Sequence, residues 1–315
     1  MTHFLLRRTL GFLATLFGVS LVVFAVMNLL PGDPVLVILG IDSTPDAQAA
    51  LRSRLGLDAP VVERYFHWIA GLLHGDFGVS YAFGVPVSGL IAERLPLTVS
   101  LALLGMGLTV VMALGLGVLA AANHRRPGDW AVMLVSQLGI AVPAFWLSML
   151  LVLLFAVKLR WLPPGGFPGW GEPLAALRAL ILPAVALALV QGAVLARVTR
   201  SSMIEVMRLD FARTARASGF SRGRVFVRHI LPNALVPIVT IAGMQFANLV
   251  TGTIVIENVF YLPGLGRLIF QAISNRDLFT VQALVLLFAA IVVTANFAVD
   301  IIYVLIDPRL KGRMA

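Results

Sequence analysis

The 315-residue sequence predicts an all-α membrane protein with six transmembrane helices, on two observations. Hydrophobic residues make up 59% of the chain and charged residues only 12%, against roughly 25% charged residues in an ordinary soluble domain. In addition, six stretches contain no Asp, Glu, Lys or Arg and are about as long as the 20 or so apolar residues that cross a hydrocarbon core. This composition excludes a water-soluble enzyme.

The six predicted spans follow one another without an internal repeat or a flexible linker, so a single domain over residues 1–315 is the simplest organisation. They cover residues 9–30, 97–122, 130–157, 179–196, 230–256 and 278–299. The first span exceeds the 7–15 apolar residues typical of a signal peptide and is interpreted as an uncleaved helix. Residues 31–96 form an insertion with a helical pattern around Pro60–Leu73, and residues 197–229 form a second polar segment.

The distribution of basic residues predicts the orientation in the membrane. The N-terminus, residues 123–129, residues 197–229 and the C-terminus together carry 15 Lys and Arg against 5 Asp and Glu, whereas the opposite side carries 9 against 10. Because the side rich in Lys and Arg is cytoplasmic, both termini are predicted to be cytoplasmic and residues 31–96 external. The net charge of +9 is therefore a topology signal, and no nucleic-acid partner is expected.

The internal segment 197–229 has a pattern of its own. An apolar stripe that advances by three or four residues predicts a helix, followed by Gly219 as a left-handed C-cap and Ser221 as the N-cap of a second short helix. The stripe consists of Ile204, Met207, Phe211, Ala215 and Ser218. Two interpretations fit it: an interfacial helix whose arginines contact anionic membrane lipid, or a helix that docks into a groove of a cytoplasmic protein.

Several motifs resemble those of ABC importer permeases, specifically the dipeptide, oligopeptide and nickel branch of these inner-membrane components. The segment Arg213–Gly219, followed after nine residues by His229–Asn233, resembles the family's EAA loop, although Arg213 and Thr214 stand where the motif has Glu and Ala. The other matching segments are Pro31–Pro34, Gly75–Gly78, Glu93–Pro96, Pro143–Trp146, Trp161–Gly165, Pro263–Arg267 and Asp307–Arg309. Together they extend over nearly the whole chain.

This resemblance implies a type I importer permease fold in a bacterial cytoplasmic (inner) membrane. It implies four partners for the chain, namely a second homologous permease, two cytoplasmic ATPases and an extracytoplasmic solute-binding protein. The solute would be a di- or oligopeptide or a related small molecule, moved by alternating access. The EAA loop would couple the chain to an ATPase through Met207, Phe211, Arg213, Ala215, Arg216, Ser218 and Gly219.

Polar residues in the fifth predicted span are candidates for the translocation pathway. Gln245, Asn248 and Gly252 fall on one helical face, with Thr251 adjacent. Intramembrane amides commonly hydrogen-bond neighbouring helices, and they also line wet pathways. Both roles are compatible with this pattern, and the fifth span contributes to the pathway in the resembling family.

Motifs for chemistry are lacking from the sequence. It contains no Gly-x4-Gly-Lys-Ser/Thr loop, no His-Glu-x-x-His pair and no Gly-x-Ser-x-Gly elbow, so no catalytic residue, cofactor or metal site is expected and ATP would bind to another chain. The main alternative is a stand-alone secondary carrier or channel. The absence of acidic residues from the six span cores counts against ion coupling of that kind. A third interpretation is a membrane scaffold that anchors a cytoplasmic complex.

Overall fold

The computed structural model describes residues 2–29, 34–40, 42–54 and 56–306. These residues are nearly all helical, and their one extended pairing is an isolated antiparallel bridge between Val79 and Pro86. The α-helices are α1 (Thr2–Leu29), α2 (Pro34–Leu39), α3 (Pro45–Arg54), α4 (Val61–Leu73), α5 (Val87–Ala122), α6 (Pro127–Ala141), α7 (Ala144–Leu151), α8 (Pro173–Met207), α9 (Asp210–Ala217), α10 (Arg222–Val225), α11 (Leu231–Val259), α12 (Leu265–Ser274) and α13 (Leu278–Ile306). Two π-helical segments, η1 (Val152–Lys158) and η2 (Phe226–Ile230), continue α7 and precede α11.

The described residues include five helices that are long and apolar enough to cross a membrane, and a sixth span if one bent pair is counted. The five lie in α1, α5, α8, the continuous run Gly223–Val259 and α13. The bent pair is α6 with α7–η1, which meet at 108°. Six spans are thus consistent with the prediction, and the third predicted span, residues 130–157, is bent rather than straight. The chain breaks before Pro143, where Val142 is extended with a ψ of 127°, because a residue that precedes proline avoids helical geometry.

Other helix limits also differ from the predicted spans. Helix α5 begins at Val87 rather than at residue 97 and continues through Pro96, so the last ten residues of the expected external insertion 31–96 belong to a span. Helix α8 extends beyond residues 179–196 on both sides. The expected internal segment 197–229 is therefore largely helical at both ends. These extensions carry the charged residues that a search for uncharged stretches leaves out.

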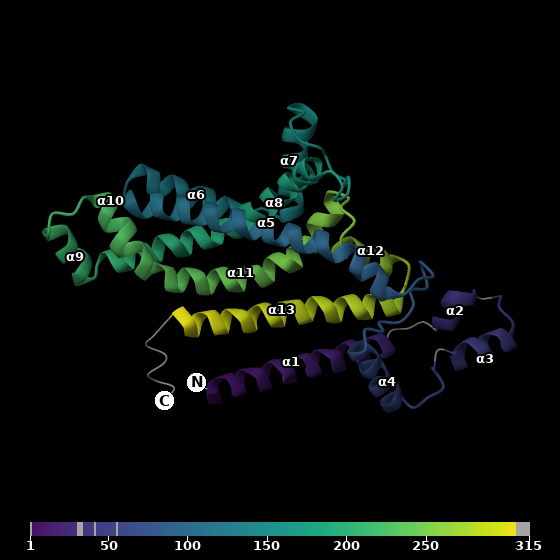
Figure 1. Cartoon of the computed structure of the whole chain (residues 1–315). Helices are drawn as coiled ribbons and strands as arrows, with labels where there is room; N and C mark the ends of the chain where they lie inside the picture. Colours follow the sequence, from purple (N-terminus) through teal and green to yellow (C-terminus); the bar gives the residue numbers. More distant parts are fainter. Residues whose placement is uncertain (1, 30–33, 41, 55, 307–315) are drawn as a thin grey trace.

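The long helices pack side by side in the order α5, α8, α11, α13 and α1 (Figure 1). Small residues allow close approach where α5 and α11 meet α8: a Cβ atom built on Gly105 or Gly252 would lie 3.3 Å from the side chain of Leu187. On Gly117 it would lie 2.5 Å from Cβ of Thr199. Close packing over small residues is the usual means of association for membrane helices, which gain little from apolar burial in lipid.

The two ends of the helix bundle carry different elements. Helices α9 and α10 lie at one end, together with the start of α1 and the end of α13 (Figure 1). Helices α2, α3, α4 and α12 lie at the other end. This arrangement separates the segment 197–229 from the insertion that follows α1 by the full length of the bundle.

Candidate coupling surface and translocation face

The predicted apolar stripe does not lie on one helix. Helix α8 ends at Met207, residues Arg208 and Leu209 form a turn, and α9 begins at Asp210. The stripe is also divided by burial, since Ala215 is buried while Phe211 and Ser218 are exposed. The expectation of a single docking face from Ile204 to Ser218 is therefore wrong, because the chain turns at residues 208–209 and gives α9 its own axis.

Helix α9 packs on the bundle through its small residues and exposes its larger ones. Ala212 and Ala215 are buried in a cluster with Met203, Val206 and Val225. The outer surface consists of residues on the remaining faces of the helix and in the preceding turn. They are Leu209, Asp210, Phe211, Arg213, Thr214, Ala217 and Ser218. We call this set the α9 outer surface.

Polar groups on the α9 outer surface bond only locally in the described structure. Ser218 Oγ donates to the carbonyl of Thr214 at 3.0 Å, and Arg213 Nη1 lies 3.3 Å from Asp210 Oδ1. Both side chains of this ion pair are largely exposed, so the pair adds little to stability. The side chain of Arg216 lies outside the described residues. The surface thus presents an apolar ring and a basic side chain that a partner could desolvate.

Gly219 ends α9 as predicted, with a φ of +82°. A side chain there would meet no atom within 4 Å, so the requirement for glycine is conformational rather than steric. The expected second helix is present as the short α10, which runs on through η2 into α11. The turn at Gly219 therefore joins α9 to a span that crosses the membrane.

A buried ion pair ties α6 to α8 near the α9 end of the bundle. Asp129, 3% exposed, accepts hydrogen bonds from Arg200 Nε on one oxygen and, at 2.8 Å, from Arg200 Nη2 on the other. The backbone N–H of Arg125 donates to the same carboxylate at 3.0 Å, and His124 Nδ1 lies 3.2 Å from it. A bidentate Arg–carboxylate pair fixes relative orientation as well as distance. It makes α6 and α8 move together.

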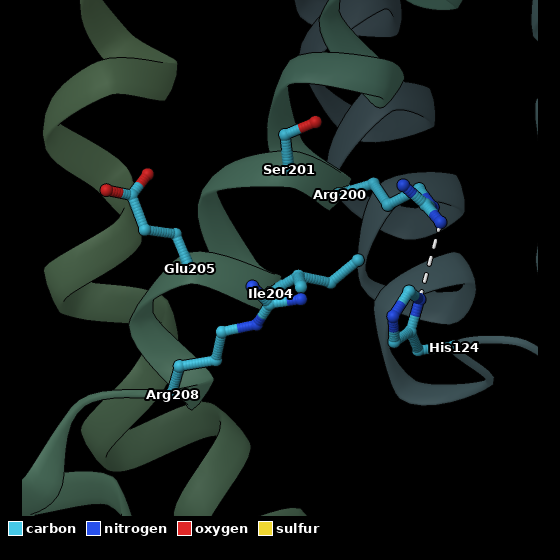
Figure 2. Close-up of a pocket in the computed structure, with 6 residues that line it drawn as sticks. All are labelled: His124, Arg200, Ser201, Ile204, Glu205 and Arg208. Atoms are coloured by element: carbon cyan, nitrogen blue, oxygen red, sulfur yellow. Dashed lines mark hydrogen bonds between the residues drawn. The ribbon is translucent and has the colours of Figure 1, made fainter.

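A cleft of about 300 Å³ opens beside this pair and is lined by His124, Arg200, Ser201, Ile204, Glu205 and Arg208. Figure 2 shows His124 and Arg200 facing each other across one side, with the carboxylate of Glu205 pointing away from them. The cleft is at the foot of α8, immediately before the turn into α9. Among the described residues no group of three or more His, Asp or Glu is placed to hold a metal ion.

The four pathway candidates lie in α11 but have different surroundings. Gln245 is buried and accepts from Asn248 Nδ2 at 3.3 Å, and Gly252 faces Leu187 of α8. Asn248 and Thr251 are exposed. The four residues therefore do not share one environment. Gln245 and Gly252 lie on the packed side of α11, and Asn248 and Thr251 lie on its open side.

The open side of α11 is a continuous strip, which we call the α11 open face. It comprises Met244, Asn248, Thr251 and Val255, at the i, i+4, i+7 and i+11 spacing of one helical face. An amide turned toward lipid would lack partners in the hydrocarbon region. The α11 open face is therefore suited to a protein neighbour or a wet passage.

At the opposite end, Glu257 organises the turn from α11 into α12. This residue is completely buried, and its carboxylate accepts from Thr98 Oγ1 at 2.7 Å, from Gly266 N at 2.7 Å and from Arg267 N at 3.2 Å. The N–H of Leu265 donates in turn to Thr98 Oγ1 at 2.9 Å. The acid therefore caps the first turn of α12 and binds it to α5.

A second buried carboxylate, Asp277, holds the loop before α5 against the start of α13. It accepts from Ser80 Oγ, from Thr280 Oγ1 at 2.8 Å and from Thr280 N at 3.3 Å. The Tyr81 ring packs on Phe279 at 5.1 Å. Burial, and secondarily Asp277, raises the pKa of Tyr81, so the phenol stays neutral at physiological pH.

Sequence reasoning missed these anchors because each acid stands one residue outside an uncharged stretch. Asp129 directly precedes the third predicted span, Glu257 directly follows the fifth and Asp277 directly precedes the sixth. The burial of these acids could not be predicted from their positions at the ends of the spans. An acid at the edge of an apolar run next to Pro-Gly turns, as in Pro127-Gly128 and Pro263-Gly264, was the available signal.

Comparison with known families decides the class of the protein. Residues 113–312 match the family described as binding-protein-dependent transport system inner membrane component, and residues 1–102 match the N-terminal model of the same transport-system component. The chain belongs to this family. It is thus a permease subunit of a binding-protein-dependent importer, the membrane component rather than the ATP-binding one, and the stand-alone carrier is set aside.

Individual relatives cover almost the entire chain. A protein described as a peptide transport system permease of Brucella abortus is 45% identical over 312 residues, 99% of each chain. The glutathione transport system permease protein GsiC of Escherichia coli K12 is 39% identical over 311 residues, again 99% of each.

Solved structures show the same fold at low identity. An inward-facing MetNI methionine ABC transporter chain is similar with a TM-score of 0.58 and 19% identity, covering 69% of this permease and 96% of that chain. An amino acid ABC transporter has a TM-score of 0.52 and 16% identity, covering 69% and 94%. These likenesses confirm the type I ABC importer permease fold.

Proposed function

We propose that this permease imports small peptides, in the range from di- to oligopeptides, including glutathione-like peptides. The observation that carries the proposal is end-to-end similarity to permeases named for peptide and glutathione transport, at 45% and 39% identity. Similarity of this extent spans the α11 open face as well as both ends of the bundle. Peptides are thus favoured over nickel chelates and other small solutes.

The working assembly contains a second homologous permease, two cytoplasmic ATPases and an extracytoplasmic binding protein. The family description supports the binding protein. The single α9 outer surface suits one ATPase, so two ATPases call for two permeases. The polar and exposed residues of the α11 open face suit the second permease or the passage between the two chains.

The charge distribution and the arrangement of the helices support the proposed orientation. The basic segment 197–229, the start of α1 and the end of α13 share one end of the bundle (Figure 1), and we assign this end to the cytoplasm. Residues 31–86 are then external, where the binding protein delivers solute. The chain works as one domain, because its spans pack against one another in one bundle.

The proposed mechanism is alternating access driven from the cytoplasmic end. ATP binding draws the ATPases together, and the α9 outer surface moves with the ATPase on which it is seated. Since Asp129 and Arg200 join α6 to α8, that motion is passed to two spans rather than to one. The α11 open faces of the two permeases separate toward the outside to accept peptide, and hydrolysis restores the inward-facing state.

The docking role of α9 is tested with Phe211→Asp, which places a charge on the apolar part of the α9 outer surface. Loss of a central interface aromatic costs about 2 kcal/mol or more, so peptide uptake and peptide-stimulated ATPase activity should each fall at least about tenfold. Phe211→Leu is the matched control, because it keeps an apolar side chain at the same exposed position. Equal activity of the two variants at equal expression would exclude the docking role.

The role of the α11 open face is tested with Asn248→Leu, against Met244→Leu on the same face as control. Neither side chain is packed in the chain core. Because Asn248→Leu also removes the hydrogen bond to buried Gln245, uptake is compared at equal amounts of assembled complex. Uptake of a labelled dipeptide should fall several-fold in Asn248→Leu only. Unchanged uptake would remove Asn248 from the pathway.

The substrate and the partners are tested by affinity isolation from the native membrane in mild detergent, followed by mass identification and reconstitution. We expect a second six-span permease and nucleotide-binding subunits in the complex, and uptake of labelled dipeptide that unlabelled peptides compete away. A complex that transports another solute without competition by peptides would keep the importer class and overturn the substrate. A chain isolated alone would contradict the assembly.

A further inference from the structure

Helix α4, in the segment predicted to be external, lies against the outer part of the first span. Tyr65 of α4 is 6% exposed, and its hydroxyl is 2.8 Å from Oγ of Ser20 in α1. Its ring packs edge-on against Phe24 and Phe17, with centroid distances of 5.3 and 6.3 Å. Trp68 stacks on Phe24 at 5.7 Å. Helix α4 is thus held to α1 by aromatic side chains and one buried hydrogen bond.

The contact with α1 places α4 at membrane depth. Ser20 lies nine residues before the end of α1 at Leu29, which corresponds to about 14 Å along the helix axis. The whole hydrocarbon core is about 30 Å thick. Because residues Leu6–Leu29 form an apolar span, the side chain of Tyr65 meets α1 below the level at which that span leaves the hydrocarbon. Figure 1 shows α4 beside the end of α1 that is away from the N-terminus.

Three different faces run along α4. Tyr65 and Trp68 pack on α1, and beside them Val62, Phe66 and Leu73 are 67%, 63% and 82% exposed. The polar residues Glu63, Arg64 and His67 are gathered on the remaining side of the helix. An exposed apolar flank next to a membrane span, with a polar face opposite, is the pattern of a helix that lies in a membrane interface.

The apolar flank of α4 continues the exposed apolar surface of α1. The Tyr65 ring lies between the rings of Phe66 at 5.5 Å and Phe17 at 6.3 Å, and Phe17 and Val22 of α1 are themselves 56% and 63% exposed. What covers the exposed side of α1 in a bilayer therefore also covers the flank of α4.

We infer that α4 is an interfacial membrane helix whose Val62, Phe66 and Leu73 side chains enter the acyl chains of the lipid leaflet beside α1, with Glu63 and His67 turned to water. The assignment to the outer leaflet rests on the orientation given under the proposed function. Trp68, which stacks on Phe24 nearer the end of α1, then lies closer to the headgroup boundary, where aromatic residues with one polar edge are enriched. The external insertion is thereby anchored to the membrane at its middle, not only at its two ends.

The chain has no cysteine, so single cysteines can be spin-labelled without removing any native residue. Phe66→Cys and Glu63→Cys, labelled in the assembled transporter in nanodiscs, report the two faces of α4. Collision with oxygen, which concentrates in lipid, is compared with collision with a water-soluble nickel chelate. Val22→Cys in α1 and Gln48→Cys in α3 serve as the lipid and water controls, since Val22 is an exposed residue of a membrane span and Gln48 is a partly exposed polar residue of the largely exposed helix α3.

The label at position 66 is expected to have an oxygen-to-nickel ratio several-fold above that at position 63 and close to that at position 22. The ratio at position 63 should approach that at position 48. A label at 66 that favours nickel as strongly as 63 would overturn the inference, as would a label at 66 reached by neither collider, which would place a protein neighbour on the flank. These outcomes do not depend on transport, so they are distinguishable from failure of the proposed function.

Discussion

The two ends of the helix bundle, external and cytoplasmic in the proposed orientation, form turns between long helices in opposite ways. At the external end, Glu257 and Asp277 are completely buried and each accepts three hydrogen bonds. At the cytoplasmic end, the outward side chains of α9 are exposed, and Arg213 pairs with Asp210 in solvent. At the first end, the polar groups of the turn are bonded within this chain, whereas the second end exposes side chains that a partner could bury.

This difference predicts that stability is concentrated at the external end and coupling at the cytoplasmic end. A buried carboxylate whose partners are backbone N–H groups cannot be replaced without leaving donors unpaired. An exposed pair can be replaced with little loss of stability. Substitutions at the two ends should therefore separate folding from transport.

The largest expected effect is that of Glu257→Ala. It removes the acceptor for Thr98 and for two backbone N–H groups, and each buried donor left unpaired costs about 1–3 kcal/mol. We expect the free energy of unfolding to fall by about 3 kcal/mol or more, measured as a loss of thermal stability in detergent. Glu93→Ala is the matched control, because Glu93 is an exposed acid on α5. A similar loss in both variants would contradict the comparison.

A smaller effect is expected from Asp129→Asn, which weakens the one buried ion pair described at the cytoplasmic end. Breaking such a pair costs about 3 kcal/mol when one charge is left buried, and the partial exposure of Arg200 should reduce this to about 2 kcal/mol. Asp210→Asn removes the acidic partner of the exposed pair with Arg213 and should cost less than about 0.5 kcal/mol. Thermal unfolding of both variants checks the order of the two effects, and equal losses of stability would contradict it.

A smaller effect on stability than that of Asp129→Asn is expected from Gly219→Ala, compared with Gly223→Ala. A Cβ atom would meet nothing within 4 Å at either position, but only Gly219 has a positive φ. The left-handed conformation costs a non-glycine residue about 1 kcal/mol. We expect little change in thermal stability but a several-fold loss of peptide-stimulated ATPase activity in Gly219→Ala alone. If Gly223→Ala loses as much activity, the geometry of this turn is not what coupling requires.

The sequence was sufficient for what depends on composition and local chemistry. Uncharged runs located the six membrane regions, Gly219 gave the end of α9, and the motifs gave the family. It was insufficient where charge is buried, because the cost of burying Glu257 is offset by Thr98, which is 159 residues away in the chain. It also failed at residues 208–209, where a break in the helix separates Met207 from Phe211 although their spacing of four is helical.

The length of helix α8 has a consequence for how its two ends can move. Its 35 residues extend over about 52 Å, far more than the thickness of the hydrocarbon core. Leu187 packs between Gly105 of α5 and Gly252 of α11. This contact divides α8 into a part of about 30 Å toward Met207 and a part of about 21 Å toward Pro173. A rigid tilt of α8 about Leu187 that moves the Met207 end by about 3 Å would move the Pro173 end by about 2 Å in the opposite direction. In such a tilt, the displacement at the Pro173 end is about a third smaller than that at the Met207 end.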